Sequence, residues 1–401
     1  MKTKPLFLAM MLAGAAGSAL AAGPTIDFSG YIRAGTGLST RGGNQVCFGL
    51  AGADTKYRLG NECDYVVEPN FDAKLADFEG ADWHVHVMPT NTYYGWGDGA
   101  ANGAPDQLMT RFNQVYTYGS HVAALGNGTV WAGRRFYNRL QTGINDQFLE
   151  NNDGDGAGLE DIDLGVGKLS VAFMMNPNGT VNDNRYSLPI RLTGVKDMPN
   201  GELAFYVTPS KQVKADDQSA NPNLVASPIS QPSGLAIGVY QTFNGLILGG
   251  NTLIGVKYDK LGETKNTRVV FQQSANFGVT AVDFITEYRN RTAAAQAGNK
   301  WFTIGARADT SIGGPFRFLV EAGHDQVKPE NGGDKLTLNK LTLALAASAG
   351  KEAGSRPTVR LFVTTAAWND AAKTALNSNT QAIFGDKKAG TTIGFQGETW
   401  W

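Results

Sequence analysis

The 401-residue sequence lacks any long apolar stretch beyond its N-terminal segment. A helix needs a run of about 18 or more apolar residues to cross a membrane, so helical membrane spans are excluded. Helical periodicity is almost absent as well. The 35 basic and 36 acidic residues leave a formal net charge of −1, and this balance does not suggest a nucleic-acid partner.

Histidine is scarce, and none of the four histidines stands in a recognisable catalytic signature. His84 and His86 alternate onto one face of a possible strand without a third metal ligand nearby. The segment that starts at Asn151 resembles the beginning of a calcium loop, but Ile162 occupies the position that requires an acidic residue. The sequence therefore predicts no enzyme, no metal site and no other cofactor.

Cysteine is limited to Cys47 and Cys63. In an exported protein a disulfide between them is favoured. It would close a loop of about 17 residues and stabilise the fold by roughly 3 kcal/mol in the chain-entropy model. A pair of free thiols is the alternative, and a zinc site is disfavoured because further ligands are missing nearby.

The N-terminal segment has the form of a secretory signal peptide. A short basic region, Met1–Lys4, precedes the apolar residues 5–20, and small residues follow at cleavage spacing. We predict cleavage after Ala21 or Ala22, so that residues 1–21 are removed and residues 22–401 form a single domain. A retained membrane anchor is the alternative, disfavoured by the short apolar stretch.

Alternation with a period of two is clearest in the last residues, Thr391–Trp401. One face is apolar and ends with Trp401, whereas the other face is polar except for Trp400. A transmembrane barrel shows this pattern, with apolar residues toward lipid, polar residues toward the lumen and aromatic residues at the interface.

The first strand candidate, Ile26–Arg33, repeats this pattern, with Tyr31 among its polar residues. Closing a barrel requires the first and last strands to pair. We therefore expect Tyr31 and Trp400 to be neighbours in the lumen and Trp401 to face lipid. Anchoring at the membrane interface is the alternative role for Tyr31 and Trp400.

Further strand candidates recur between clusters of Gly, Asn, Asp and Pro, a pattern typical of a sandwich or a barrel. Two segments are expected to be long loops: Arg41–Glu62, and Leu140–Gly158, which we expect to fold inward and narrow the lumen. Asp370–Thr380 is also expected to be a loop. The strand candidates are Val66–Asp72, Trp83–Met88, Trp131–Arg139, Lys168–Met175, Ser187–Gly194, Glu202–Thr208, Leu235–Thr242, Leu253–Tyr258, Arg268–Gln273, Val279–Arg289, Trp301–Thr310, Phe316–His324, Lys335–Ala347 and Pro357–Ala367.

Several segments resemble the maltoporin family, the sugar-specific porins of the Gram-negative outer membrane. These segments are Ile26–Arg33, Lys56–Cys63, Thr129–Tyr137, Gly156–Asp163, Ser355–Pro357, Trp368 and the terminal Trp400–Trp401. The resemblance implies an all-β fold, a transmembrane antiparallel β-barrel of eighteen strands with an inward-folded constriction loop. It also implies a homotrimer in outer-membrane lipid and a Cys47–Cys63 disulfide.

The resemblance also implies a path of aromatic side chains for sugar rings, flanked by ionic groups. The implied stacking aromatics are Tyr31, Trp96, Phe148, Trp368 and Trp400, with Trp96 reaching into a neighbouring subunit. The implied ionic residues are Arg33, Arg58, Glu68, Arg111, Arg139 and Asp146. Ordinary ion pairs in the barrel wall are the alternative role for the charged residues.

The chain departs from the family pattern at several lumenal positions. Val66 stands where the family has a tyrosine, and Tyr65 beside it falls on the opposite face. Phe148 keeps the ring of a constriction tyrosine without its hydroxyl. Two polar constriction positions hold Gln141 and Gly143, and residues 251–253 include no counterpart to a family phenylalanine. These changes affect the expected substrate more than the fold.

The sequence thus predicts an outer-membrane porin for passive diffusion of maltose and maltodextrins. A porin of the same fold for another sugar, such as sucrose or a related oligosaccharide, is the alternative. A barrel enzyme or an adhesive barrel is disfavoured because no catalytic signature exists and a lumen lined with stacking aromatics would have no role.

Overall fold

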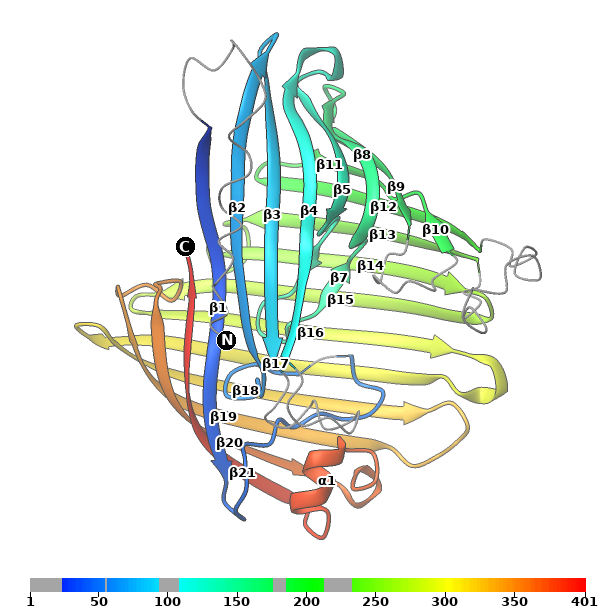
Figure 1. Cartoon of the computed structure of the whole chain (residues 1–401). Coiled ribbons are helices and arrows are strands. Elements are labelled where there is room, and N and C mark those ends of the chain that lie inside the picture. The colour runs from blue at the N-terminus through cyan, green and yellow to red at the C-terminus, as the bar shows by residue number, and fades with distance from the viewer. Residues whose placement is uncertain (1–23, 55, 94–107, 176–184, 213–232) are drawn as a thin grey trace, which may run out of the picture.

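A computed structural model describes residues 24–401 except for residue 55 and the segments 94–107, 176–184 and 213–232. Its strands form one closed antiparallel wall (Figure 1). The strands are β1 (Thr25–Ser39), β2 (Tyr65–Phe78), β3 (Ala81–Tyr93), β4 (Leu108–Val122), β5 (Gly128–Arg135), β8 (Gly154–Asp163), β9 (Lys168–Met175), β10 (Arg185–Ser187), β11 (Ile190–Val195), β12 (Gly201–Gln212), β13 (Gly234–Asn244), β14 (Asn251–Leu261), β15 (Thr264–Phe277), β16 (Thr280–Thr292), β17 (Asn299–Gly313), β18 (Phe316–Pro329), β19 (Leu336–Ser348), β20 (Thr358–Trp368) and β21 (Ala389–Trp400).

The wall closes because β1 pairs with β21, and these strands lie side by side in blue and red in Figure 1. Strands β10 and β11 each pair with both β9 and β12, so together they occupy one span. Pro189 lies between them and lacks the N–H that a continuous ladder needs. The described strands therefore make eighteen spans, as predicted.

The two faces of the wall differ in polarity, as β20 illustrates. Val359, Leu361 and Val363 point outward and are 60, 57 and 42 % exposed. Arg360 and Thr364 point inward and are buried. In a soluble protein the apolar face of a sheet is buried and the polar face is exposed. The opposite distribution found here suits a wall surrounded by lipid.

The connections divide the barrel into two rims. The long-loop rim holds loop L1 (residues 40–64), loop L3 (residues 136–153) and loop L9 (residues 369–388). The connections at the opposite, short-turn rim are brief, the longest being residues 349–357. The first residue of β1 and the last of β21 also lie at the short-turn rim.

Loop L1 and loop L9 cover part of the interior at the long-loop rim. A buried cluster joins Val46, Phe48 and Leu50 of L1 to Trp368 and to Phe384. Phe384 belongs to the short helix α1 (Ser378–Phe384), which begins after Asn377. The Asn377 side chain accepts the Thr380 N–H and so caps this helix. Among the described residues, no helix has the length and apolarity to cross a membrane.

The structure differs from the predicted elements in four places. Residues 370–380, expected to be a loop, contain a 3-10 turn (Asp370–Ala372) and the start of α1. Strand β4 had no counterpart among the candidates, and β8 begins inside the predicted loop 140–158. Strand β8 was missed because its inward positions Gly156 and Gly158 give no contrast between apolar and polar residues. Finally, β5 ends at Arg135, so Arg139 belongs to loop L3 rather than to a strand.

Candidate pore site

Loop L1 enters the barrel and rests against the inner wall at β17 and β18. The ring of Tyr57 packs over Gly305 and Gly323, which lie directly opposite each other in the two strands. A Cβ atom at Gly305 or Gly323 would lie 2.1 or 2.0 Å from the Tyr57 ring, so only glycine leaves room. The Tyr57 hydroxyl is hydrogen-bonded to Thr303 Oγ1 at 2.6 Å.

The backbone of L1 is bonded to polar side chains of the wall. Glu321 Oε1 accepts the Leu59 N–H at 2.9 Å, and Lys340 Nζ and Thr342 Oγ1 each donate to the Leu59 carbonyl at 2.9 Å. Lys340 and Glu321 form a buried ion pair at 2.9 Å. Because a buried backbone group needs a partner, these side chains fix the path of the loop.

The Cys47–Cys63 disulfide closes most of loop L1, with Cα atoms 5.9 Å apart. Both cysteines are buried. The predicted disulfide is therefore confirmed, and the free-thiol alternative is set aside.

Loop L3 also folds inward, as predicted, through a small hairpin of β6 (Leu140–Gln141) and β7 (Phe148–Glu150). Glu150 accepts hydrogen bonds from Tyr240 Oη at 2.7 Å and from Lys257 Nζ at 2.8 Å on the barrel wall. L1 and L3 meet where the Arg58 N–H donates to the Ile144 carbonyl at 3.1 Å. Two loops, rather than one, therefore narrow the lumen.

An ionic network lies where L1 meets the β1–β21 junction. Glu398 accepts hydrogen bonds from Tyr31 Oη at 2.9 Å and Arg58 Nη2 at 3.1 Å, and it also binds Arg360. Arg33 forms ion pairs at 2.7 Å with Glu62 and with Asp64. The network alternates cations and carboxylates, and each can exchange hydrogen bonds with a polar solute.

The loop residues of this network have shifted pKa values. Burial acts to lower the pKa of Arg58, but the carboxylates Glu62 and Glu398 outweigh it and hold that pKa well above its usual value. Burial acts to raise the pKa of Asp64, but Arg33 and Lys56 outweigh it and lower that pKa. Both groups are therefore charged at neutral pH.

The two terminal tryptophans lie on opposite faces of the wall, as predicted. Trp400 is the register partner of Tyr31 on the inward face and is 47 % exposed. The Arg356 guanidinium carbon lies 3.9 Å from the Trp400 ring centroid. Trp401 lies outside, with its ring centroid 5.3 Å from that of the exposed Phe28.

Two of the predicted ionic residues, Glu68 and Arg111, lie on the nearby strands β2 and β4. Glu68 is the register partner of Tyr31 in β2 and accepts a hydrogen bond from Asn113 Nδ2 at 3.3 Å. Arg111 is exposed and pairs in register with the inward Thr90. Both side chains therefore belong to the lumenal face.

The predicted residues of loop L3 form local pairs. Arg139 Nε donates to both Asp153 carboxylate oxygens at 2.9 Å, and its guanidinium lies 4.8 Å from the Phe148 ring centroid. Gln141 Nε2 donates to Asp146 Oδ1 at 2.6 Å. Burial raises the pKa of Asp146, an effect that Arg58 opposes without cancelling.

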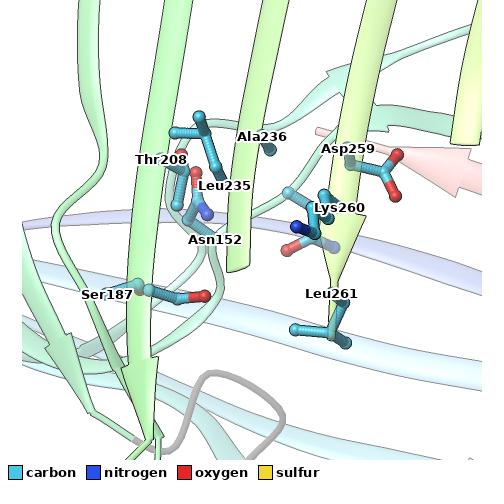
Figure 2. Close-up of a pocket in the computed structure, with 10 residues that line it drawn as sticks. Asn152, Ser187, Thr208, Leu235, Ala236, Asp259, Lys260 and Leu261 are labelled. Atoms are coloured by element: carbon cyan, nitrogen blue, oxygen red, sulfur yellow. The ribbon is translucent and has the colours of Figure 1, made fainter. Parts of the chain in front are cut away.

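A cavity of about 420 Å³ lies beside L3 at the long-loop rim (Figure 2). Figure 2 shows four of the residues that line it: Asn152 of L3, and Thr208, Leu235 and Asp259 of three successive strands. Among the described residues, its lining offers hydroxyl, amide and carboxylate groups but no aromatic ring. This cavity therefore lacks the stacking surface found at Trp400.

Comparison with known proteins assigns the family. The family model described as LamB porin matches residues 26–401. The chain belongs to the LamB porin family. The resemblance to maltoporins is thus confirmed, and the barrel is an outer-membrane porin. In such barrels the long loops are extracellular and the short turns periplasmic, so the long-loop rim of this LamB porin faces the outside.

Solved structures with the same barrel fold share little sequence with this LamB porin. OccAB1 and OccAB2 of Acinetobacter baumannii each have a TM-score of 0.53, at 8 and 10 % identity. The matches cover 94 % of this chain and 96 and 98 % of the two neighbours. The anion-selective porin of Comamonas acidovorans has a TM-score of 0.48 at 14 % identity, covering 94 % of this chain and 100 % of the neighbour. The two higher scores show the fold alone.

Trp368 has a different environment from the one expected of a stacking aromatic in a LamB porin. It points inward but is only 4 % exposed. Its ring packs against Phe48 of L1, with centroids 6.2 Å apart, and its indole N–H donates to the Lys387 carbonyl at 3.0 Å. Loops L1 and L9 therefore cover this ring. Trp96, another expected stacking aromatic, lies outside the described residues.

The sequence prediction omitted several residues of the network. Glu398 and Arg360 lie on the inward faces of strands whose alternation was recognised. Their polar positions in those strands could have identified them as lumenal residues. Glu62 and Tyr57 belong to L1, where no periodicity exists. Arg356 precedes β20 and reaches Trp400 only because β20 and β21 are adjacent.

Proposed function

We propose that this LamB porin mediates passive diffusion of maltose and maltodextrins across the outer membrane. One observation carries the proposal: the exposed ring of Trp400 lies in the lumen opposite Tyr31, next to an alternating network of cations and carboxylates. A pyranose ring has apolar faces edged by hydroxyl groups. Trp400 can stack on such a face while Arg58 and Glu398 exchange hydrogen bonds with the hydroxyls.

The remaining predicted residues extend this path in the proposal. Arg33, Glu68 and Arg111 supply polar contacts along the wall, while Asp146 and Arg139 supply them at the constriction. Because both polar and apolar sides of the sugar keep partners along the path, the solute is never fully desolvated. The process needs neither covalent chemistry nor an energy source.

A porin for another sugar, such as sucrose or a related oligosaccharide, is the second candidate. Its support is the shortness of the open aromatic path: Trp368 is covered, the Phe148 ring faces Arg139, and Val66 replaces an aromatic. A short path offers stacking to few rings at a time. A small sugar needs fewer stacking positions than a long maltodextrin.

Ion conductance through single pores in planar bilayers separates the two candidates. Maltose, a series of maltodextrins and sucrose are added in turn, and the half-blocking concentration of each is measured. Block that strengthens from maltose to longer maltodextrins supports the first candidate. Strongest block by sucrose supports the second, and conductance unaffected by every sugar would refute both.

We also propose two features that the family resemblance implies. Three copies of the chain assemble, with Trp96 reaching into the neighbouring pore, and residues 1–21 are removed during export. Light scattering of the purified protein in detergent measures the mass of the assembly. N-terminal sequencing of the membrane-inserted protein locates the cleavage site, expected after Ala21 or Ala22.

A further inference from the structure

Four lysines form an exposed basic belt on the outer face at the long-loop rim: Lys260, Lys265, Lys300 and Lys328. They alternate with inward residues and share the outward face with exposed apolar side chains of β14, β15, β17 and β18, such as Val256, Val269, Ile304 and Phe318. Unlike the arginines of the lumen, these lysines point toward the surrounding membrane.

The belt consists of two pairs of like charges. Lys260 lies directly opposite Lys265, and Lys300 lies directly opposite Lys328. Cross-strand partners have Cβ atoms about 5 Å apart, and like charges at this distance destabilise a sheet. No carboxylate in the described part of the chain forms an ion pair with any of the four, although Lys328 Nζ donates to the Gly333 carbonyl at 2.7 Å.

The surroundings suit an anion at the lipid boundary. Tyr258 lies two residues before Lys260 on the same outward face, and Tyr288 is exposed on the intervening strand β16. Tyrosines at this depth mark the membrane interface. At the short-turn rim, the same side of the barrel carries the exposed apolar residues Phe277 of β15, Val279 of the β15–β16 turn and Phe316 of β18 instead.

The Lys300–Lys328 pair also borders an open site. Both lysines line a cavity of about 480 Å³ together with Arg291 and Asn299. Glu330 lines it too, but its Oε2 is bonded to the N–H groups of Gly298, at 3.0 Å, and Ala293, at 3.3 Å. The cavity thus offers more cationic than anionic groups to a bound molecule.

We propose that the basic belt binds the phosphate groups of an anionic lipid in the outer leaflet. One phosphate lies between the ammonium groups of Lys260 and Lys265, and a second lies between those of Lys300 and Lys328. The lysine stems follow the apolar surface while their charged ends reach the head groups. The two phosphate positions, one between β14 and β15 and the other between β17 and β18, are three strand spacings apart, roughly 14 Å, so one lipid that carries two phosphates can reach both pairs.

The test measures binding of lipid A with two phosphates to the detergent-solubilised, full-length protein by native mass spectrometry. The variant replaces all four lysines by glutamine: Lys260→Gln, Lys265→Gln, Lys300→Gln and Lys328→Gln. A matched control replaces four other lysines at or near the same rim: Lys335→Gln, Lys373→Gln, Lys387→Gln and Lys388→Gln. One lysine near anionic lipid changes binding by about fivefold, so the first variant should bind at least about tenfold more weakly, and the control should bind as the native protein does.

Two further titrations identify the source of the phosphate. Lipid A stripped of its phosphates should bind the native protein as weakly as intact lipid A binds the belt variant. Inorganic phosphate at equal concentration should not compete. Full competition by inorganic phosphate, equal binding of the stripped lipid, or native affinity in the belt variant would each overturn the proposal. Unchanged open-pore conductance reports that the belt variant is folded; should it not fold, each lysine pair is replaced separately.

Discussion

Adjacent residues at the end of the chain have opposite environments. Trp400 faces the lumen, where Arg356 packs on one side of its ring, whereas Trp401 packs outside on Phe28 and closes over Gly30. A single peptide bond separates them because side chains alternate along a strand. The two residues therefore allow the pore and the wall to be tested separately.

Trp400→Ala should weaken sugar block by roughly threefold to tenfold, the loss expected for one stacking contact. The open-pore conductance should not fall, because the removed ring lines the lumen and supports no strand pair. Half-blocking sugar concentrations in planar bilayers measure the effect.

Trp401→Ala is the matched change on the outer face. It should reduce the yield of folded barrel in the membrane and leave sugar block unchanged in the pores that form. If Trp401→Ala changed the block and Trp400→Ala changed only the yield, the assignment of faces would be wrong.

We expect the buried carboxyl group of Asp146 to make the constriction sensitive to pH. Burial raises its pKa above that of a free aspartate, about 3.9, so this carboxylate becomes neutral at a higher pH than an exposed one. The lumen then gains net positive charge near Arg58, and cation selectivity should fall as the pH decreases through that raised pKa. Because the fold favours the protonated form, the contribution of Asp146 to stability increases in the same direction.

The reversal potential in a salt gradient, measured between about pH 7 and pH 4, reports this change. Asp146→Asn should show the low-pH selectivity already at neutral pH and lose the part of the pH dependence that the native pore owes to this group. An unaltered pH profile in Asp146→Asn would show that Asp146 does not influence the permeating ions.

At the scale of whole elements, loop L1 behaves as part of the wall. Its Tyr57 ring occupies the space above two paired glycines, and its backbone is bonded to Glu321 and Lys340. The disulfide closes most of the loop, from Cys47 to Cys63. Loop L3 then packs on L1 through Ile144 and Arg58. The position of L3 at the constriction therefore depends on L1, and the position of L1 depends on the barrel wall.

Gly323→Ala should displace loop L1, because the new Cβ would lie 2.0 Å from the Tyr57 ring. We expect a loss of about 1–3 kcal/mol in stability, as for other overpacked sites, together with a larger and noisier open-pore current. Thermal unfolding in detergent and single-pore recordings measure the two effects.

The control is Gly354→Ala in the β19–β20 connection, where an added Cβ meets nothing within 4 Å. It should change neither quantity. In the double variant Tyr57→Ala with Gly323→Ala, the clash is absent, so Gly323→Ala should cost little more than Tyr57→Ala alone. An additive double variant would mean that the ring and the glycine do not interact.

At the scale of the molecule, the alternation of the wall makes a further prediction. Val363→Lys places a charge on the lipid face of β20 and should destabilise the barrel by about 2–4 kcal/mol near the middle of the membrane. Ser29→Lys places the same charge on the exposed inward face of β1 and should be tolerated. Urea or thermal unfolding in lipid vesicles compares them; equal losses would contradict the assignment of faces.

The barrel was predictable because apolar and polar side chains must alternate along each strand, and this pattern can be seen within a short stretch of sequence. Strand β9 was predicted with its observed bounds, Lys168–Met175, and the expectation that Tyr31 and Trp400 are neighbours followed from barrel closure together with the alternation of the two strands. Strand β8 was missed because glycines occupy two of its inward positions, residues 156 and 158. The inward path of L1 escaped because Tyr57, Glu321 and Lys340 are far apart in sequence, and no periodicity connects them.

The site was predictable to the extent that it lies on strands. Tyr31, Arg33 and Trp400 lie on the inward faces where alternation put them. Whether an aromatic ring is exposed to the lumen could not be predicted in this way, because it depends on which loops cover the wall. Trp368 points inward as expected, yet L1 and L9 close over it, and only the folded loops decide this.

The packing of the Tyr57 ring over Gly305 and Gly323 limits how this pore can be re-engineered. Loop exchange between porins is a natural way to alter what passes, and L1 looks like a separable segment because a disulfide closes it. Gly305 and Gly323 belong to the wall, however, and the three atoms nearest to a Cβ at either glycine all belong to Tyr57. A transplanted L1 without an aromatic residue at that position would leave a cavity above the two glycines. A recipient barrel with larger residues in place of the two glycines would clash with the Tyr57 ring of the native loop. The loop and the glycine pair form one module and have to be moved together.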